Sequence, residues 1–403
     1  MKMKKSFIIL LVLILTLVVS GCGSTAPTAT DKAPDAGKQP DAGKKEEVIK
    51  IGVIVAITGP ASVLGKPMAE GAELVKKQLQ AMGGKIGGKN VEIIIKDYES
   101  NDTTGLLHMK QLVSEENIIA VVGTTQTSTT MAISDIAQEK QIPLMSISPL
   151  TKQGDYIFNL NQGDELSLQR ITDYLIKKNI KSVAWINSRD GFGQGGLPVF
   201  KKLAEKNGIN IVATEDFDAS ATDMTVPLTK IKAKNPEAII SWSRSPGAGI
   251  VAKNYKQLGF KVPMIQSHAA SNQGFLKQVG KDGEGVLAVG TKVSVFGSLT
   301  PSDQEIYKNY ISDYKAQFGY SPDNNSTLPY DGLKILLKAI EAGKTTGKEI
   351  NDWLVSGGLG EYVGLNGKFN YIKSDKRNGP DASALVILEA YNDGSNMAWR
   401  LLD

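Results

Sequence analysis

Cysteine and histidine are scarce in this chain of 403 residues, which has one cysteine and two histidines. A single cysteine excludes a disulfide within the chain. His108 and His268 alone cannot complete a zinc site, and neither has a partner for a Cys-His nucleophile. The folded part also lacks an HExxH motif and the GxSxG elbow of a serine hydrolase. These absences argue against an enzyme and against a bound metal or other cofactor.

One glycine-rich segment, Gly191 to Gly196, has the GxGxxG spacing of a dinucleotide-binding loop, with Asp216 further along the chain. However, residues 187–190 separate it from the preceding strand pattern, whereas the fingerprint needs its first glycine at the end of the strand. Residues 1–21 also have the pattern of an export signal, and an exported protein would meet little NAD. We therefore expect these glycines to shape a tight turn and not to bind a cofactor.

The first 47 residues have the pattern of an exported, lipid-anchored protein. Lysines precede an apolar run that is too short to span a membrane, so residues 1–21 are predicted to be a signal peptide. The segment ends in Ser-Gly-Cys, which resembles the bacterial lipobox and predicts lipidation of Cys22. Residues 22–47 are poor in apolar side chains and are expected to form a disordered tether. The protein is thus expected outside the cytoplasm, held at the membrane only by its lipid.

The charge balance gives no reason to expect a nucleic acid partner. The predicted signal peptide carries three lysines and no acid, so its removal leaves 43 basic residues against 42 acidic ones. A near-neutral chain lacks the basic surface that phosphate backbones require.

From about residue 48, short β-branched runs alternate with longer amphipathic ones. The predicted strands lie at 50–57, 91–97, 118–123, 142–147, 182–187, 209–214, 238–242 and 262–267. The predicted helices lie between them, at 66–82, 103–116, 129–140, 164–179, 195–207, 225–234 and 247–259. This repeated pattern predicts an α/β fold of mostly parallel sheets flanked by helices. The body is too long for one ordinary domain and suits two.

Small hydroxylated residues follow several of the predicted strands. Segment 124–130 has six hydroxyl side chains in seven positions. Ligands of open parallel sheets bind beyond the carboxyl ends of strands, and a helix beginning near Thr129 would offer backbone N–H groups and its positive dipole end. A second hydroxyl segment, 148–151, follows the next strand. Together they predict a carboxylate site; the alternative is one hydroxyl that caps the helix and others that face solvent.

Several segments resemble the branched-chain amino-acid-binding type of periplasmic solute-binding proteins, which serve ABC importers. The resemblance is carried by Thr58-Gly59-Pro60 with Gly65 and Gly71-Ala72, by GTTQTSTTMAISDIAQEKQIPLMSISP, by DGFGQG and by PYDGLKILLKAIEAG. It implies a type I fold of two lobes that close on a ligand, with ABC permease and ATPase subunits as partners. The implied lobes are 48–161 with 292–370, and 162–291 with 371–403.

The resemblance also assigns ligand-binding residues by position, and several of them lie in the hydroxyl segments. In the first lobe these are Leu64, Ser128 or Thr129, Ser148, Leu150 and Thr151, with Tyr330 in the last matching segment. In the second lobe Phe192 occupies the place of a usual aromatic residue, and Ser243, Arg244 and His268 follow strands.

The position of His268 departs from the pattern that the resemblance implies. Amino-acid binders commonly have an acidic residue there, which pairs with the ligand's ammonium group. Beside Arg244, a desolvated ammonium without a carboxylate is unfavourable, so the sequence predicts an aromatic or branched aliphatic carboxylate that lacks an α-ammonium group. The alternative is that Asp190 or Asp331 supplies the acid, or that Arg244 faces solvent, and that leucine, isoleucine or valine binds. A ligand-sensing domain for a signalling partner and an exported enzyme are the other function classes.

Overall fold

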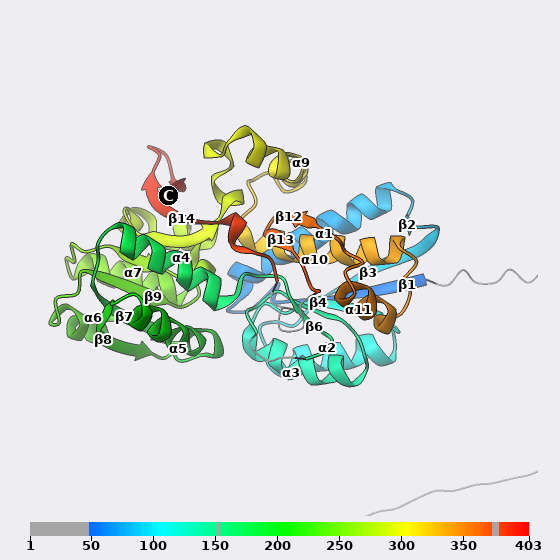
Figure 1. The fold of residues 1–403 in the computed structure, drawn as a ribbon, viewed down its shortest axis with the longest axis horizontal. Helices are drawn as coiled ribbons and strands as arrows, with labels where there is room; N and C mark the ends of the chain where they lie inside the picture. The colour runs from blue at the N-terminus through cyan, green and yellow to red at the C-terminus, as the bar shows by residue number, and fades with distance from the viewer. Residues whose placement is uncertain (1–47, 151–153, 373–378, 403) are drawn as a thin grey trace, which may run out of the picture. The chain divides into compact units, whose positions relative to one another are not determined.

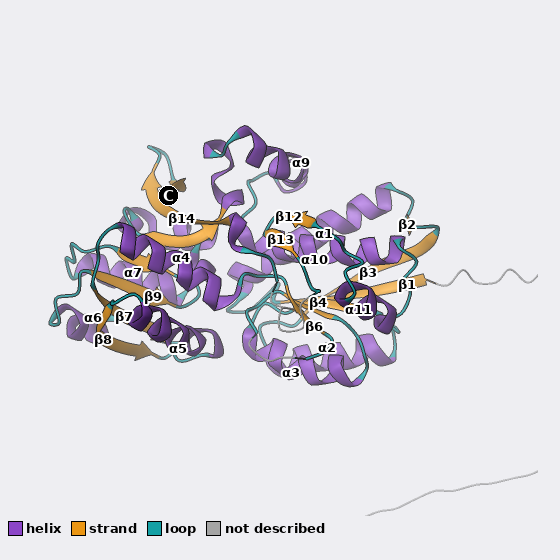
Figure 2. Ribbon diagram, viewed as in Figure 1, coloured by secondary structure: helices purple, strands orange, loops and turns teal. Residues whose placement is uncertain are grey.

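Two separate β-sheets organise the chain, and each has helices on both faces (Figure 1, Figure 2). The structure is a computed structural model that describes residues 48–150, 154–372 and 379–402. The predicted signal peptide, Cys22 and the tether lie outside these described residues, as does Thr151. None of the helices in the described ranges has the length and apolar character needed to cross a membrane.

The first sheet has the strand order β2-β3-β1-β4-β5-β6, with parallel neighbours except for the β2–β3 hairpin. Its strands are β1 (Val48–Val55), β2 (Lys85–Ile86), β3 (Lys89–Asp97), β4 (Ala120–Gly123), β5 (Leu144–Ser146) and β6 (Ile157–Asn159). Helices α1 (Ser62–Ala81), α10 (Asn324–Glu341) and α11 (Gly347–Val355) cover one face, and α2 (Asp102–Ser114) and α3 (Thr127–Glu139) cover the other. Alternate residues of β1 therefore enter different cores, Ile51 and Val53 beneath α1, and Ile54 beneath α2.

The second sheet has the order β15-β14-β11-β10-β9-β7-β8, and only β14 and β15 run antiparallel to their neighbours. Its strands are β7 (Ser182–Ser188), β8 (Asn210–Phe217), β9 (Ala238–Trp242), β10 (Met264–Gln266), β11 (Leu287–Thr291), β14 (Leu385–Asn392) and β15 (Met397–Leu401). Helices α4 (Gly163–Lys177) and α5 (Gly191–Lys206) cover one face, and α6 (Thr225–Lys232), α7 (Gly247–Gln257) and α8 (Gln273–Val279) cover the other. Trp185 and Ile186 are consecutive in β7 and enter these two opposite cores.

The chain crosses between the two sheets more than once. It leaves the first sheet after β6, returns to it with α10 and goes back to the second sheet with β14. The remaining elements are α9 (Pro301–Phe318), the hairpin β12 (Tyr362–Gly364) with β13 (Gly367–Phe369), and the 3-10 helices η1 (His268–Ala270), η2 (Gly280–Gly283), η3 (Lys292–Ser298) and η4 (Ala382–Ala384). Helix α9 packs on α1, where the hydroxyls of Tyr314 and Tyr320 both donate to the Glu70 carboxylate.

The predicted α/β fold with mostly parallel sheets is confirmed. The prediction was possible because buried parallel strands are apolar on both faces. The interpretation of Gly191 to Gly196 as a tight turn is wrong, since these residues form the first turns of α5. The segment is rich in glycine because α5 packs closely on its surroundings. A Cβ on Gly193 would collide with the Ser188 carbonyl, and one on Gly196 with the Trp242 indole.

Candidate functional site

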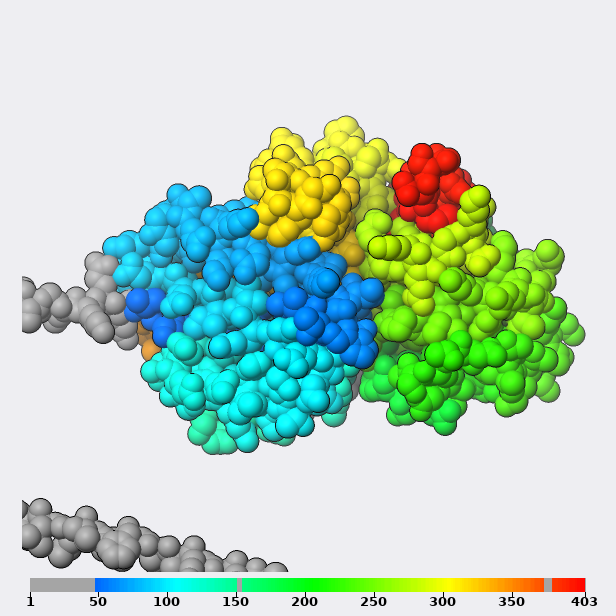
Figure 3. Space-filling model, turned by 180° about the vertical axis from the view of Figure 1, so that it is seen from behind, coloured from blue at the N-terminus to red at the C-terminus, as the bar shows by residue number. Residues whose placement is uncertain are grey.

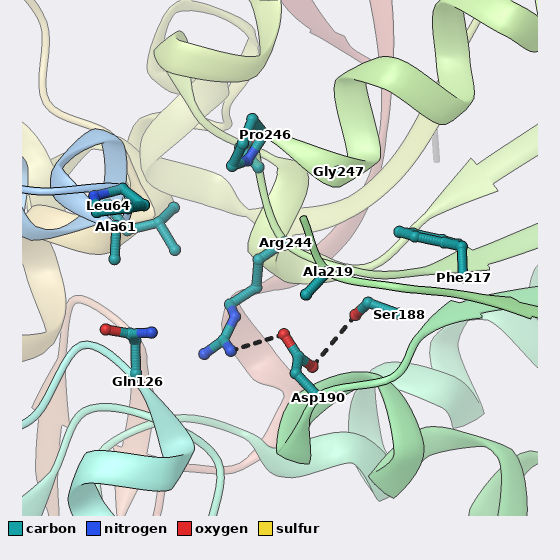
Figure 4. A pocket seen from close by; sticks show the side chains of 12 residues that line it. Ala61, Leu64, Gln126, Ser188, Asp190, Phe217, Ala219, Arg244, Pro246 and Gly247 are labelled. Carbon is teal, nitrogen blue, oxygen red and sulfur yellow. Dashed lines mark hydrogen bonds and ion pairs between the residues drawn. The ribbon is translucent and has the colours of Figure 1, made fainter. Parts of the chain in front are cut away.

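A pocket of about 140 Å³ lies where loops of the two sheets meet, beyond the carboxyl ends of their parallel strands. On the molecular surface, residues of the first sheet (blue to cyan) and of the second (green) adjoin along a narrow seam (Figure 3). Strand ends, loops and first helical turns line the pocket (Figure 4). The first sheet's side contributes Pro60, Ala61, Leu64 and Gln126, and the second sheet's side contributes Ser188, Asp190, Phe217, Ala219, Arg244, Ser245, Pro246 and Gly247.

Four helices begin at this pocket, because the residue that precedes each of them lines it. These residues are Ala61 before α1, Gln126 before α3, Asp190 before α5 and Pro246 before α7. Only Asp190 caps its helix with a side chain, which accepts the Gly193 N–H; the other three helices have no side-chain cap bond. The positive dipole ends of three helices that lack a side-chain cap therefore lie at one space, an arrangement that favours an anion.

Arg244 and Asp190 form the pocket's ion pair, with Nη2 donating to Oδ2 at 2.9 Å. Their side chains are 13% and 26% exposed. Burial alone raises the pKa of Asp190, but the charge of Arg244 and hydrogen bonds from Gly193, Arg244 and Ser188 outweigh it and leave the pKa below its ordinary value. The other terminal nitrogen of Arg244, Nη1, is buried and has no hydrogen-bond partner among the described residues. A ligand carboxylate would give this nitrogen an acceptor.

Two of the predicted ligand-binding residues, Leu64 and Arg244, line the pocket. Phe192 lies behind the guanidinium of Arg244, whose Cζ is 5.5 Å from the ring centroid, and it is only 2% exposed. Its other neighbours are Trp242, stacked on it at 5.7 Å, and His268, edge-on at 5.4 Å. Phe192 therefore supports Arg244 and is not itself part of the pocket wall.

His268 and Ser243 also lie beneath the pocket wall. The imidazole of His268 packs against Phe192 and Trp242, and burial lowers its pKa to about 4, so it is neutral at pH 7. Ser243 is fully buried, and its carbonyl accepts the Ser267 hydroxyl. A neutral imidazole in this place cannot attract either ion of a ligand by charge.

The hydroxyl segment after β4 is mostly used for internal bonding, which corrects the predicted placement of two carboxylate-binding residues. Helix α3 begins at Thr127, two residues before the predicted start. The hydroxyls of Ser128 and Thr129 consequently face α2 and donate to the Asp102 carboxylate. Thr125 accepts the Ala56 N–H at 3.0 Å and so ties the segment to the end of β1.

Among the described residues, three further predicted ones, Ser148, Leu150 and Tyr330, do not line the pocket. The Ser148 hydroxyl bonds the Thr130 hydroxyl at 2.7 Å, and Leu150 is buried, with its carbonyl accepting from Asn159. Tyr330 on α10 packs edge-on against Tyr310 at 4.7 Å, in the α1–α9–α10 contact and outside the pocket lining. Asp331 is buried and accepts the N–H groups of Leu365 and Asn366, so it is not available as an acid in the pocket.

Sequence reasoning missed Gln126, which is the only amide in the hydroxyl segment and lines the pocket. It also missed Ser245 and Pro246, although they directly follow Arg244. The rule that ligands bind beyond the carboxyl ends of parallel strands could have found them. The rule had been applied only as far as residue 244, and it should have been extended to the start of the next helix. Within the described residues, no group of three or more acidic, histidine or cysteine side chains could hold a metal ion.

Two helix-flanked parallel sheets with a pocket at their facing edges define a periplasmic binding protein of type I. The family model described as periplasmic binding protein matches residues 48–392, and the chain belongs to this solute-binding family. Membership implies an extracytoplasmic location. Leu/Ile/Val-binding protein homolog 3 of Brucella melitensis is 25% identical over 250 residues, which cover 60% of this chain and 67% of the relative. Homolog 7 of Brucella suis is 22% identical over 73% of this chain and 77% of its own length.

Solved structures have the same fold. An extracellular ligand-binding receptor from Rhodopseudomonas palustris HaA2 superposes with a TM-score of 0.78 at 26% identity, over 88% of this chain and 99% of that one. The branched-chain amino acid transporter substrate-binding protein LivJ from Streptococcus pneumoniae, solved in complex with isoleucine, superposes with a TM-score of 0.75 at 23% identity, over 88% of this chain and 99% of LivJ.

Proposed function

We propose that the protein is the extracytoplasmic receptor of an ABC importer, anchored by a lipid on Cys22, and that it delivers a small carboxylate to permease and ATPase subunits. Residues 48–161 with 292–370 form one lobe of the proposed receptor, and 162–291 with 371–403 form the other. The pocket between the two sheets is the proposed ligand site. Family membership and the Leu/Ile/Val-binding relatives support this proposal.

The proposed ligand is a carboxylate without an α-ammonium group, and the state of Arg244 carries this proposal. Its Nη1 has no acceptor among the residues that the structure describes, while its Nη2 already neutralises Asp190, the one acid among the described pocket residues. Both oxygens of Asp190 are engaged, Oδ1 by the Gly193 N–H and Oδ2 by Arg244. An ammonium group would have to compete with Arg244 for this carboxylate and lie beside a buried guanidinium.

Size and wall chemistry limit the proposed ligand further. At roughly 10–15 Å³ for each water-sized group, a pocket of 140 Å³ holds a ligand of about ten non-hydrogen atoms. Leu64 and Phe217 supply apolar wall for a ring or branched chain. Benzoate and 4-methylpentanoate, the deaminated analogue of leucine, are therefore suitable probes.

A branched-chain amino acid is the second candidate, and the position of Asp190 favours it. This acid lines the pocket beside Arg244, so a zwitterion could place its carboxylate on Arg244 and its ammonium on Asp190. The names of the Brucella relatives point the same way. This arrangement requires the ion pair to open at least partly when the ligand enters.

A thermal-shift screen of the full chain with Cys22→Ala distinguishes the two candidates. A ligand at about 100 times its dissociation constant should add about 2.7 kcal/mol to the free energy of unfolding. We expect benzoate or 4-methylpentanoate to raise the melting temperature, and leucine and valine to have less effect. Stabilisation by leucine and valine alone would favour the second candidate, and turnover of any bound compound would contradict the receptor role.

A further inference from the structure

Gln126 occupies the N-cap position of α3, yet its side chain makes no bond to the helix. Serine, threonine, aspartate and asparagine are the usual residues at this position because their short side chains reach the orphan N–H groups. The longer side chain of Gln126 instead lines the pocket. Its amide is thus placed toward a ligand and is not used for capping.

Tyr98 follows β3 and fixes the orientation of that amide. Its hydroxyl accepts the backbone N–H of Gln126 at 3.1 Å and donates to Oε1 of the same residue, also at 3.1 Å. A phenol has one proton, so this donation assigns the oxygen of the amide to Tyr98 and leaves Nε2 as the group for the pocket. In the reversed amide, the buried phenol would lose the carbonyl oxygen to which it donates.

The state of the phenol supports its role as a donor. Burial raises the pKa of Tyr98, and the hydrogen bonds of its neighbours and the charge of Arg244 offset only part of this rise. The phenol is therefore protonated at pH 7 and can donate.

Across the pocket, the amide nitrogen of Gln126 is turned toward the guanidinium of Arg244, while Asp190 lies on the far side of Arg244 (Figure 4). The two donors come from different sheets, Gln126 from the loop after β4 and Arg244 from the loop after β9. An anion between them would accept from both and join the two sheets' loops. A cation between the two side chains would face the N–H groups of both (Figure 4).

We propose that Tyr98 is a positioning residue that holds the Gln126 amide as a donor opposite Arg244, and that this pair of donors makes the pocket select anionic groups over ammonium-bearing ones. This inference rests on the proposed function, since it assigns ligand discrimination to the same pocket. Without the Tyr98 hydroxyl, the amide is free to reverse, and Oε1 can then accept from an ammonium group.

The test compares affinities for benzoate, 4-methylpentanoate and leucine, measured by calorimetry on the full chain in detergent. Gln126→Leu should weaken carboxylate binding by roughly 10- to 100-fold, because a charged acceptor loses a donor. Tyr98→Phe keeps the ring and should reduce the carboxylate-to-leucine affinity ratio by roughly 10-fold through weaker carboxylate and stronger leucine binding. Gln126→Glu should reverse the preference, because it places an acid opposite Arg244.

Tyr371→Phe is the matched control, because it also removes the hydroxyl of a buried tyrosine but at a place outside the pocket lining. Tyr371 is also buried in the first sheet's core, and its hydroxyl donates to the Asn159 carbonyl at 3.0 Å. This variant should lower stability and leave the affinity ratio unchanged. If Tyr98→Phe does not fold, Gln126→Leu and Gln126→Glu decide the question by their affinity ratios.

The outcomes separate this inference from the function on which it rests. In one outcome, the wild type binds a carboxylate while Tyr98→Phe and both Gln126 variants keep the wild-type carboxylate-to-leucine affinity ratio. That result overturns the role of Tyr98 and Gln126 and leaves the proposed receptor function intact. Failure of the wild type to bind either carboxylate overturns the proposed ligand class and this inference together. A lower carboxylate-to-leucine affinity ratio in Tyr98→Phe, together with an unchanged ratio in Tyr371→Phe, supports the inference.

Discussion

Replacing Arg244 with methionine removes one partner of a mostly buried ion pair and leaves Asp190 with a charge that lacks its counterion. Breaking a fully buried pair costs about 3–5 kcal/mol. Because the Arg244 and Asp190 side chains are 13% and 26% exposed, and Gly193 and Ser188 still donate to the carboxylate, we expect a smaller loss of about 2 kcal/mol in the free energy of unfolding.

Urea unfolding at pH 7 of Arg244→Met, Asp190→Asn and the double variant measures this loss. The double variant should be less destabilised than the sum of the two single variants, with a coupling energy of about 1–2 kcal/mol. Additive single effects would refute the ion pair as a stabilising contact. Calorimetry of Arg244→Met should also show carboxylate affinity reduced by roughly 100-fold.

The pH dependence of the same variant gives an independent check. The pKa of Asp190 is lowered in the folded wild type, so its contribution to stability is present above the ordinary pKa and is lost as pH falls through the lowered one. The stability difference between wild type and Arg244→Met should therefore shrink between pH 6 and pH 3. A difference that stays constant with pH would mean that packing, and not charge, is lost with Arg244.

Three further outcomes follow from the described contacts and from the predicted anchor. The folded-state pKa of His268 is lowered to about 4, so the wild type should lose about 3 kcal/mol of unfolding free energy between pH 7 and pH 4, as unfolding lets the imidazole take up a proton. Urea unfolding of His268→Gln at the same two pH values should lack this loss, and an equal loss in both proteins would contradict the lowered pKa. Thr129→Val should cost about 1 kcal/mol of stability through its bond to Asp102 and leave carboxylate affinity unchanged; a large affinity loss in calorimetry would return Thr129 to the site. Cys22→Ala should release the protein from membranes without altering ligand affinity, and retention of a cleaved variant in membrane fractions would contradict lipid anchoring.

Apolar periodicity was sufficient to predict an α/β fold of mostly parallel sheets, because strand burial is local in sequence and has a simple period. The division into two lobes, each with its own sheet, was implied by the family resemblance. The start of α3 was misplaced because Gln126 is not a usual capping residue, whereas the threonines after it are. That shift changed the assignment of the hydroxyls, whose partners lie far away in sequence. Thr125 binds Ala56 and Thr129 binds Asp102, and no pattern within the segment indicates either contact.

Of the predicted site residues in the second sheet's loops, Arg244 lines the candidate pocket. Arg244 stood out as a lone charge at a strand end and does line the pocket. Its pairing with Asp190, 54 residues away, depends on the packing of β7 beside β9. Phe192 was expected to contact the ligand, but the guanidinium of Arg244 lies over its ring. Such occlusion depends on side-chain packing in three dimensions and has no signature in the sequence.

Calorimetric titration of the full chain with benzoate, 4-methylpentanoate, leucine and valine, repeated on Arg244→Met, tests the central claim most directly. A carboxylate held by Arg244 should give saturable heat with the wild type for at least one acid that lacks nitrogen, and little or none with Arg244→Met. Micromolar binding of leucine or valine, with no heat from the nitrogen-free acids, would contradict the proposed ligand class. Equal affinity of wild type and Arg244→Met for every ligand would place the binding site elsewhere in the protein.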